Sequence, residues 1–196
     1  MSLQGQRTTT TAMEWDDFKS VIAKLERDKE YKFCILIAAG VFTGLRISDL
    51  LKLQWRDLEK PEIIVVKEKK TTKHRSIKVN EDLAALARRI RQKLGNPPED
   101  ELIFINRWKT KAIDKNYVNR KLKKILDRYG IVLEGNASTH LFRKTLGNRV
   151  LKLYNYAPEA IYLLMDLFEH SSPLMTKRYL GIRQREIHDI YDKLRL

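Results

Sequence analysis

Four short segments of the sequence hold residues that could act together on a phosphodiester. The first contains Arg46, the second is a lysine-rich turn, the third contains His140 and Arg143, and the fourth ends at Tyr179. Breaking a phosphodiester without a metal requires a nucleophile, a proton donor for the leaving oxygen and fixed cations around the non-bridging oxygens. Arginine suits the last role, because its planar guanidinium bonds two oxygens at once and stays charged.

In the first segment, glycine and acidic residues flank the arginine. Gly44 allows a tight turn that places Arg46 at the start of a helix, where backbone N–H groups favour an anion. Asp49 lies three residues after Arg46, so the two share a helix face and Asp49 could brace the guanidinium. Taken alone, this segment fits an ordinary surface ion pair better.

The second segment, residues 67–78, carries six Lys or Arg and a single acidic residue. In a predicted β-hairpin such a turn is often simply solvated, or it protects the edge of a strand. A lysine on the turn could also reach into a groove and donate a proton. The segment by itself does not decide between these readings.

The third and fourth segments each place a reactive side chain on a predicted helix. His140 and Arg143 are three residues apart at a helix start, so both could face one ligand. Either serine of residues 171–172 could cap a helix that has Pro173 in its first turn, and Tyr179 lies near the end of that helix. Taken singly, such a histidine is more often a surface residue, and such a tyrosine a core or surface residue.

The order and spacing of these segments resemble those of the tyrosine recombinase (phage integrase) family. The pattern R…K…HxxR…H…Y lies between about Trp15 and Leu180, with His170 and Tyr179 nine residues apart. The strings TGLRISDLLKLQW, KTTKHRSIKV, THLFRKT and HSSPLMTKRYLG carry the resemblance. Four weak signals in the family's order make a specific one.

The resemblance implies how the phosphate would be held and the leaving group protonated. Arg46 and Arg143 would hold the scissile phosphate, and Asp49 would occupy the supporting acidic position. Lys70 would protonate the leaving 5′-oxygen, with Lys73 as the alternative if the turn is shifted by a few residues.

The resemblance also assigns the nucleophile and its partners. His140 would accept the proton of the tyrosine, and His170 would hydrogen-bond the phosphate. Tyr179 would attack the phosphorus and form a 3′-phosphotyrosyl bond, which keeps the energy of the phosphodiester. Because such enzymes need neither ATP nor a divalent metal, no cofactor and no metal site are expected.

Three positions depart from the family's pattern. Glu169 stands where glycine is common before the position of His170, and Phe168 replaces the usual leucine. Lys144 stands where many members have a second histidine. None of these changes removes a group that the chemistry needs. Because an anion beside a phosphate site is unfavourable, we expect the Glu169 side chain to point away.

The elements that must position these residues are mostly helices. Apolar spacing predicts an amphipathic helix from about Met13, an apolar helix from Tyr31 to about Phe42, and a short third helix from residues 45–46 to about Leu53. Two β-branched stretches after residue 61 predict a hairpin, with residues 55–58 as a candidate third strand.

The second half of the sequence predicts further helices. Asn80 is placed to cap one helix, and Gly130 to end another that has an apolar stripe. Four short helices are expected from about Thr139 onward. The predicted fold is mainly α with a small three-stranded antiparallel sheet, which is the integrase catalytic-domain fold that the resemblance implies.

The expected domain organisation is simple. Residues 1–12 are predicted to be a disordered linker or a cloning remnant, and residues 13–196 to form one catalytic domain with a C-terminal helix from about residue 182. Members of the family usually carry an N-terminal core-binding domain, which we expect to be absent here. The chain alone should therefore bind DNA weakly and recombine poorly.

Composition points to a polyanionic partner. The 196 residues include 39 Lys and Arg against 25 Asp and Glu, a formal net charge of +14. Such a charge fits nucleic acid, because phosphate contacts release condensed counterions, but also a ribosomal protein or an anionic membrane surface. The single cysteine, Cys34, excludes an internal disulfide, and the sequence has no secretory signal and no apolar run long enough to span a membrane. A cytoplasmic protein is expected, associated with the nucleoid if it is bacterial.

Basic side chains outside the four segments could contact a DNA backbone. Residues 107–128 hold nine Lys or Arg against two acids, and most of these cations avoid the apolar stripe of the predicted helix. A solvated helix face is the alternative. Trp108 and Tyr117 could pack on sugars or bases, or in the core. The cations expected to contact DNA are Lys73, Arg75, Arg107, Lys109, Lys111, Lys115, Arg120, Lys121 and Lys124.

The resemblance implies partners as well as chemistry. Double-stranded DNA is the expected substrate, with a homotetramer on a DNA synapse, a monomer when free, and room for an accessory directionality protein. Two alternatives stay open: relaxation of DNA by a type IB topoisomerase-like reaction, and a non-catalytic DNA-binding module on the same fold. A basic RNA-binding protein would leave the order of the Arg, Lys, His and Tyr positions unexplained.

Overall fold

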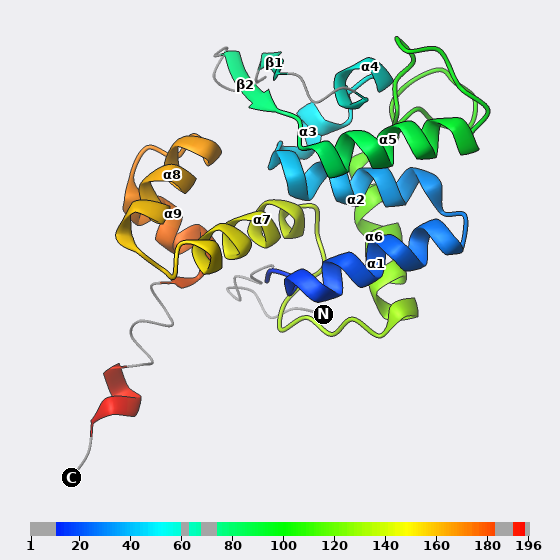
Figure 1. The fold of residues 1–196 in the computed structure, drawn as a ribbon. Coiled ribbons are helices and arrows are strands. Elements are labelled where there is room, and N and C mark those ends of the chain that lie inside the picture. Colours follow the sequence, from blue (N-terminus) through cyan, green and yellow to red (C-terminus); the bar gives the residue numbers. More distant parts are fainter. Residues whose placement is uncertain (1–10, 60–62, 68–73, 183–189, 195–196) are drawn as a thin grey trace.

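The computed structural model describes residues 11–59, 63–67, 74–182 and 190–194 (Figure 1). Within these ranges the chain is mainly helical with one hairpin, as the sequence predicts. The elements are α1 (Trp15–Arg27), α2 (Tyr31–Thr43), α3 (Ile47–Leu50), α4 (Trp55–Leu58), β1 (Ile63–Lys67), β2 (His74–Lys78), α5 (Glu81–Lys93), α6 (Lys115–Tyr129), α7 (His140–Leu153), α8 (Pro158–Phe168) and α9 (Pro173–Leu180).

Helix α2 is the centre of the larger part of the molecule. Ten of its thirteen residues are buried, which fits a helix that is apolar on all sides and surrounded by others. It contacts α1, α5 and α7. A Cβ atom at Gly40 would come within 2.5 Å of the Phe142 ring, so the glycine allows α7 to pack closely against α2.

Buried apolar residues form two separate clusters. The larger cluster extends from Met13 to Phe142 and includes buried side chains of α1 to α6 and the start of α7. The smaller cluster consists of Leu151, Ala160, Ile161, Leu164, Phe168 and Leu180, from α7, α8 and α9. Figure 1 shows α8 and α9 beside the far end of α7, apart from the helices around α2. Helix α7 therefore joins the two clusters.

The sheet has two strands in the described part of the chain, so the three-stranded sheet predicted from the sequence is not found. Strands β1 and β2 pair antiparallel, with Ile63 opposite Lys78 and Lys67 opposite His74. The segment expected as a third strand is helix α4. The Asp57 carboxylate accepts a hydrogen bond from the Gln54 backbone N–H at 2.8 Å and completes a capping box.

Helix ends follow the local sequence more closely. The Asn80 side chain accepts hydrogen bonds from the first turn of α5, and Gly130 ends α6 with a φ of 70°. Ser172 caps α9 by accepting a hydrogen bond from the Met175 N–H at 3.2 Å. These three predicted ends are confirmed. The third predicted helix is shorter than expected, because α3 ends at Leu50.

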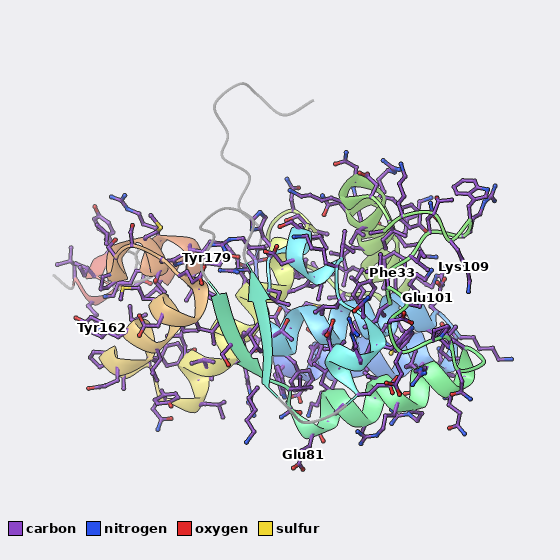
Figure 2. The ribbon with its side chains drawn as sticks, turned by 90° about the horizontal axis from the view of Figure 1, so that it is seen from above. Phe33, Glu81, Glu101, Lys109, Tyr162 and Tyr179 are labelled. Carbon is purple, nitrogen blue, oxygen red and sulfur yellow. The ribbon has the colours of Figure 1, made fainter. Side chains whose placement is uncertain are left out.

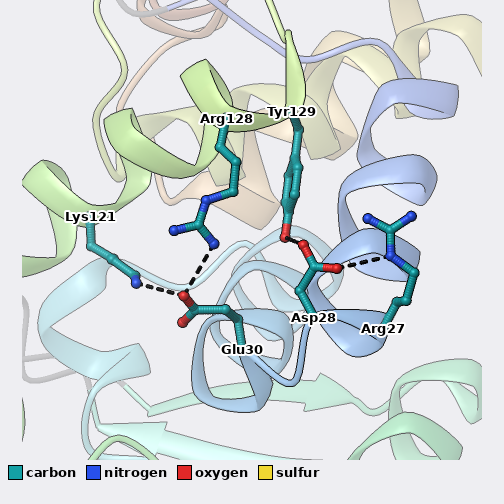
Figure 3. Close-up of polar contacts among 6 residues, drawn as sticks. All are labelled: Arg27, Asp28, Glu30, Lys121, Arg128 and Tyr129. Carbon is teal, nitrogen blue, oxygen red and sulfur yellow. Dashed lines mark hydrogen bonds and ion pairs between the residues drawn. The ribbon is translucent and has the colours of Figure 1, made fainter.

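Polar contacts fasten α6 to the corner between α1 and α2 (Figure 3). Tyr129 Oη donates a hydrogen bond to Asp28 Oδ2 at 2.9 Å. Glu30 Oε1 pairs with Lys121 Nζ at 2.7 Å and with Arg128 at 3.4 Å. The cationic face of α6 is thus partly used to hold the fold together.

Candidate active site

Arg143 lies at the boundary between the two clusters. It is on α7 with only 5% of its surface exposed. Its Nη1 donates to the Gly44 carbonyl at 2.9 Å, and its Nη2 donates to the Phe168 carbonyl at 2.9 Å. The guanidinium also lies over the Phe168 ring, 4.6 Å from its centroid. One side chain therefore connects the end of α2 to the end of α8, and its guanidinium is fixed in place.

Arg46 reaches the same region from the larger cluster. Gly44 ends α2 with a φ of 59°, and Arg46 directly precedes the first turn of α3. This confirms the predicted tight turn. A Cβ atom at Gly44 would come within 2.7 Å of Leu146, so both the backbone conformation and the packing favour glycine.

Glu169 corrects an expectation. Its side chain does not point away from the site, because its Oε2 lies 3.4 Å from Arg46 Nη1. Glu169 ends α8 in the left-handed conformation, with φ 52° and ψ 47°. Arg46 and Arg143 concentrate positive charge here, and that charge attracts a carboxylate as it would attract a phosphate.

His170 follows Glu169 and is oriented by a buried threonine. Its Nδ1 lies 3.0 Å from Oγ1 of Thr176, which has no exposed surface. Burial, together with the charges of Arg143 and Arg46, lowers the pKa of His170 to about 4. The imidazole is therefore neutral at pH 7.

Tyr179 is surrounded by the residues that the sequence grouped with it. Its ring centroid lies 5.2 Å from that of His170 and 6.2 Å from that of His140. The phenol oxygen is buried and makes no hydrogen bond of regular geometry among the described residues. Burial raises the pKa of Tyr179, and the neighbouring Arg143 guanidinium partly opposes that shift. Lys144 Nζ lies 5.3 Å from the centre of the ring.

His140 is the first residue of α7 and keeps an exposed face. Partial desolvation lowers the pKa of His140, and the positive charges of Lys115, Arg143 and Lys144 act in the same direction. The histidine therefore favours its neutral form, in which one ring nitrogen accepts a proton.

Asp49 is buried, and its backbone N–H donates to the Arg46 carbonyl at 2.9 Å, but its carboxylate makes no hydrogen bond to the Arg46 guanidinium. Only 1% of Asp49 is exposed, and neither carboxylate oxygen has a hydrogen-bond partner among the described residues. Its ion pair is with Lys52 Nζ at 3.6 Å. The predicted brace is therefore not formed through a hydrogen bond.

The lysine-rich turn can be placed only in part. Lys70 and Lys73 lie outside the described residues, and Arg75 is described only as a backbone position in β2. The assignment of Lys70 as the proton donor for the leaving oxygen therefore stays a prediction.

The cations expected to contact DNA separate into two groups. Six of them have exposed side chains, whereas Lys121 is partly buried beside Glu30. Trp108 is 68% exposed, and the Arg107 guanidinium lies 4.3 Å from the centre of its ring. Figure 2 shows Lys109 next to Glu101 and far from Tyr179. The exposed group is Arg107, Lys109, Lys111, Lys115, Arg120 and Lys124.

Sequence reasoning missed three features of the site: the Glu169–Arg46 pair, the Thr176 contact and the carbonyl partners of Arg143. The positive φ of Glu169 could have been predicted, because glycine, which favours this conformation, is common at this position in the family's pattern. The described residues contain no group of three His, Cys, Asp or Glu side chains that could hold a metal. Among them, too, no helix has both the length and the apolar character needed to cross a membrane.

The sequence and fold match known proteins over most of the chain. The model of the phage integrase family matches residues 12–186. The probable integrase/recombinase YoeC of Bacillus subtilis (strain 168) is 29% identical over 167 residues, which cover 82% of this chain and 87% of YoeC.

Solved structures of tyrosine recombinases share the fold. The XerA recombinase superposes with a TM-score of 0.70 at 18% identity, over 97% of this chain and 68% of XerA. The Tn1549 transposon integrase, solved in complex with transposon right end DNA, gives 0.67 at 18% identity, over 96% of this chain and 68% of that one. A lambda integrase dimer bound to a core site gives 0.65 at 17% identity, over 92% of this chain and 50% of that one.

Proposed function

This chain belongs to the phage integrase family, and we propose that it cuts and rejoins double-stranded DNA through a transient bond from Tyr179 to a 3′-phosphate. One observation carries the proposal. The Tyr179 phenol, on α9, lies beside two neutral histidines and the Arg143 guanidinium, although these groups come from three separate helices or loops. Such a set supplies a nucleophile, a base and fixed positive charge at one place.

Arg46 and Arg143 are proposed to hold the scissile phosphate. An arginine has five N–H donors, so the two carbonyl bonds of Arg143 leave others for a phosphate oxygen. Those carbonyl bonds also fix the guanidinium before DNA binds. Positive charge that is already in position needs no reorganisation when charge builds on the phosphate oxygens.

The histidines are proposed to move and direct protons. A tyrosine is protonated at neutral pH, and the raised pKa of Tyr179 makes the need for a base greater. His140 favours its neutral form and is able to accept the phenolic proton. If Thr176 donates to His170 Nδ1, the other ring nitrogen carries a proton and can donate it to a phosphate oxygen.

The reaction exchanges one phosphoester for another. The Tyr179 oxygen bonds to phosphorus as the bond to the 5′-oxygen breaks, and the 5′-oxygen takes a proton, for which the family resemblance assigns Lys70. Because the number of phosphoester bonds is unchanged, the step needs neither ATP nor a divalent metal. The reverse step rejoins the strand.

Double-stranded DNA is the proposed partner. The Tn1549 integrase structure contains transposon right end DNA, and the lambda integrase dimer is bound to a core site. By analogy we propose that this chain acts on DNA as a homotetramer in a synapse, is a monomer when free, and works in the cytoplasm. The exposed cations of the loop before α6 and of α6 itself are proposed to contact the backbone.

The proposed function is tested by trapping the covalent intermediate. The protein is incubated in EDTA with nicked duplexes of randomised sequence, in which the cleaved end diffuses away and traps the intermediate. We expect a protein–DNA adduct that resists denaturation for the unmodified protein and none for Tyr179→Phe. An adduct that forms equally well with Tyr179→Phe would overturn the assignment of the nucleophile.

A further inference from the structure

We propose that Glu169 is an internal competitor for the phosphate at Arg46, so that this arginine is released only to a phosphate that other groups of the site also bind. The inference rests on the proposed function for the identity of the phosphate. It concerns a residue at which this chain differs from the usual family pattern, and it makes Glu169 a specificity-determining residue for DNA binding.

The contact itself joins the two halves of the site. Glu169 Oε2 lies 3.4 Å from Arg46 Nη1, and the two residues are 123 positions apart in the chain. The Arg46 side chain is 26% exposed and that of Glu169 is 20% exposed. The pair is therefore neither fully solvated nor sealed in the core, and an anion from solution can reach it.

The backbone shows that a side chain at this position is unusual. Four described helices end in a left-handed residue, and three of them use glycine: Gly44 after α2, Gly130 after α6 and Gly181 after α9. Helix α8 ends in Glu169 at φ 52°. A residue with a Cβ is disfavoured in this conformation. The other described non-glycine residues with a positive φ are Lys29, Asn96, Lys109, Asn155 and Tyr156. The Glu169 carboxylate thus lies beside Arg46 even though the backbone conformation at position 169 favours glycine.

The ion pair between Glu169 and Arg46 is weak enough for a phosphate to displace the carboxylate. Partly exposed ion pairs of this kind are weak, since solvent screens them. A phosphodiester that also contacts Arg143 and His170 gains several charge-assisted hydrogen bonds at once and displaces the carboxylate. A phosphate that meets Arg46 alone gains one contact and must compete for it. Glu169 therefore favours a fully engaged phosphate over an isolated contact.

The test compares three variants in a titration with inorganic phosphate. Glu169→Gln removes the charge, and Glu169→Gly removes the side chain while favouring the observed backbone. Glu159→Gln is the matched control, because Glu159 is an exposed glutamate at the start of the same helix and its substitution removes the same charge. The readout is the side-chain Nε–H resonance of Arg46, assigned by its loss in Arg46→Lys.

We expect both Glu169 variants to bind phosphate at Arg46 about fivefold more tightly than the unmodified protein, the ratio that a weak ion pair implies. The Glu159→Gln control should stay within the range set by its change in net charge. Equal affinities in all variants would overturn the proposal. So would a fall in the thermal midpoint of Glu169→Gln without any gain in affinity, which would make the pair a structural tie.

This titration does not depend on Tyr179 chemistry. If no variant forms a DNA adduct while the phosphate affinities differ as expected, the proposed function fails and the competition at Arg46 stands. If adducts form, we also expect Glu169→Gln to form them about fivefold faster than Glu159→Gln at DNA concentrations below saturation.

Discussion

The two halves of the site lie on hydrophobic clusters of very different size. Arg46 follows α2, whose residues are the centre of the larger cluster, whereas His170 and Tyr179 lie beside the six-residue cluster of α7, α8 and α9. Few buried apolar contacts imply low local stability. We infer that the half with Arg46 is rigid, that the half with His170 and Tyr179 opens more easily, and that the Arg143 hydrogen bonds to both halves hold them in a fixed relative position.

Removing Arg143 should have the largest effect. In Arg143→Ala both carbonyl bonds are lost, as is a fixed positive charge beside Tyr179, so adduct formation should fall by at least about 10³-fold. Hydrogen exchange in α8 and α9 should rise. Arg149→Ala is the control, because Arg149 is on the same helix but lies over Trp15. Unchanged exchange in α8 and α9 would contradict the linking role.

A cavity in the larger cluster should destabilise the whole chain, whereas a cavity in the smaller cluster should destabilise mainly α8 and α9. Leu36 and Leu164 are both fully buried, so replacing either by alanine costs about 2–5 kcal/mol where the cluster cannot collapse. We expect Leu36→Ala to lower the free energy of unfolding of the whole chain, measured with denaturant. Leu164→Ala should instead raise hydrogen exchange mainly in α8 and α9. Equal loss of protection in α2 from Leu164→Ala would show a single cooperative unit.

The contact between Thr176 and His170 should affect catalysis more than binding. Thr176→Val keeps the shape of the side chain but loses the oxygen that lies 3.0 Å from His170 Nδ1, so the imidazole loses its orientation. We expect adduct formation at saturating DNA to fall roughly tenfold, which is less than the about 10²-fold or greater loss expected when a proton-transfer group is removed outright, while DNA affinity is kept. Thr176→Ser should restore most of the rate, and a failure of serine to do so would count against a positioning role.

The pH dependence of stability should reveal the lowered pKa of His170. His170 has a pKa of about 4 in the folded protein against 6.5 for an ordinary histidine, so the unfolded chain binds more protons between these values. The free energy of unfolding should therefore decrease as the pH falls from 6.5 toward 4. Denaturant titrations of His170→Asn should show a shallower decrease. An identical slope in this variant would place the titrating group elsewhere.

The sequence predicted best what depends on neighbouring residues. The caps at Asn80 and Ser172 and the stop at Gly130 each involve groups within a few positions, and the structure confirms them. Residues 55–58 were predicted as a candidate third strand beside the hairpin, but Trp55 and Leu58 are three positions apart, which is helical spacing, and the Gln54–Asp57 capping box favours the helix.

Contacts between distant segments were the part that sequence could not supply. The expectation for Glu169 was wrong because its partner, Arg46, is 123 positions away and is brought near only by the packing of α7. The carbonyl partners of Arg143 are backbone atoms, which carry no residue-type signal at all. The roles of the site residues themselves, and of Lys70 in particular, stay predictions.

The most direct test is to locate the covalent bond within the protein. An adduct trapped on a nicked duplex is digested with protease and nuclease, and the peptide that retains a nucleotide phosphate is sequenced by mass spectrometry. We predict that the phosphate is on Tyr179, in a peptide from α9 and thus from the less extensively packed half of the site. A nucleotide on any residue of the larger cluster's half would contradict the division of roles between the two halves.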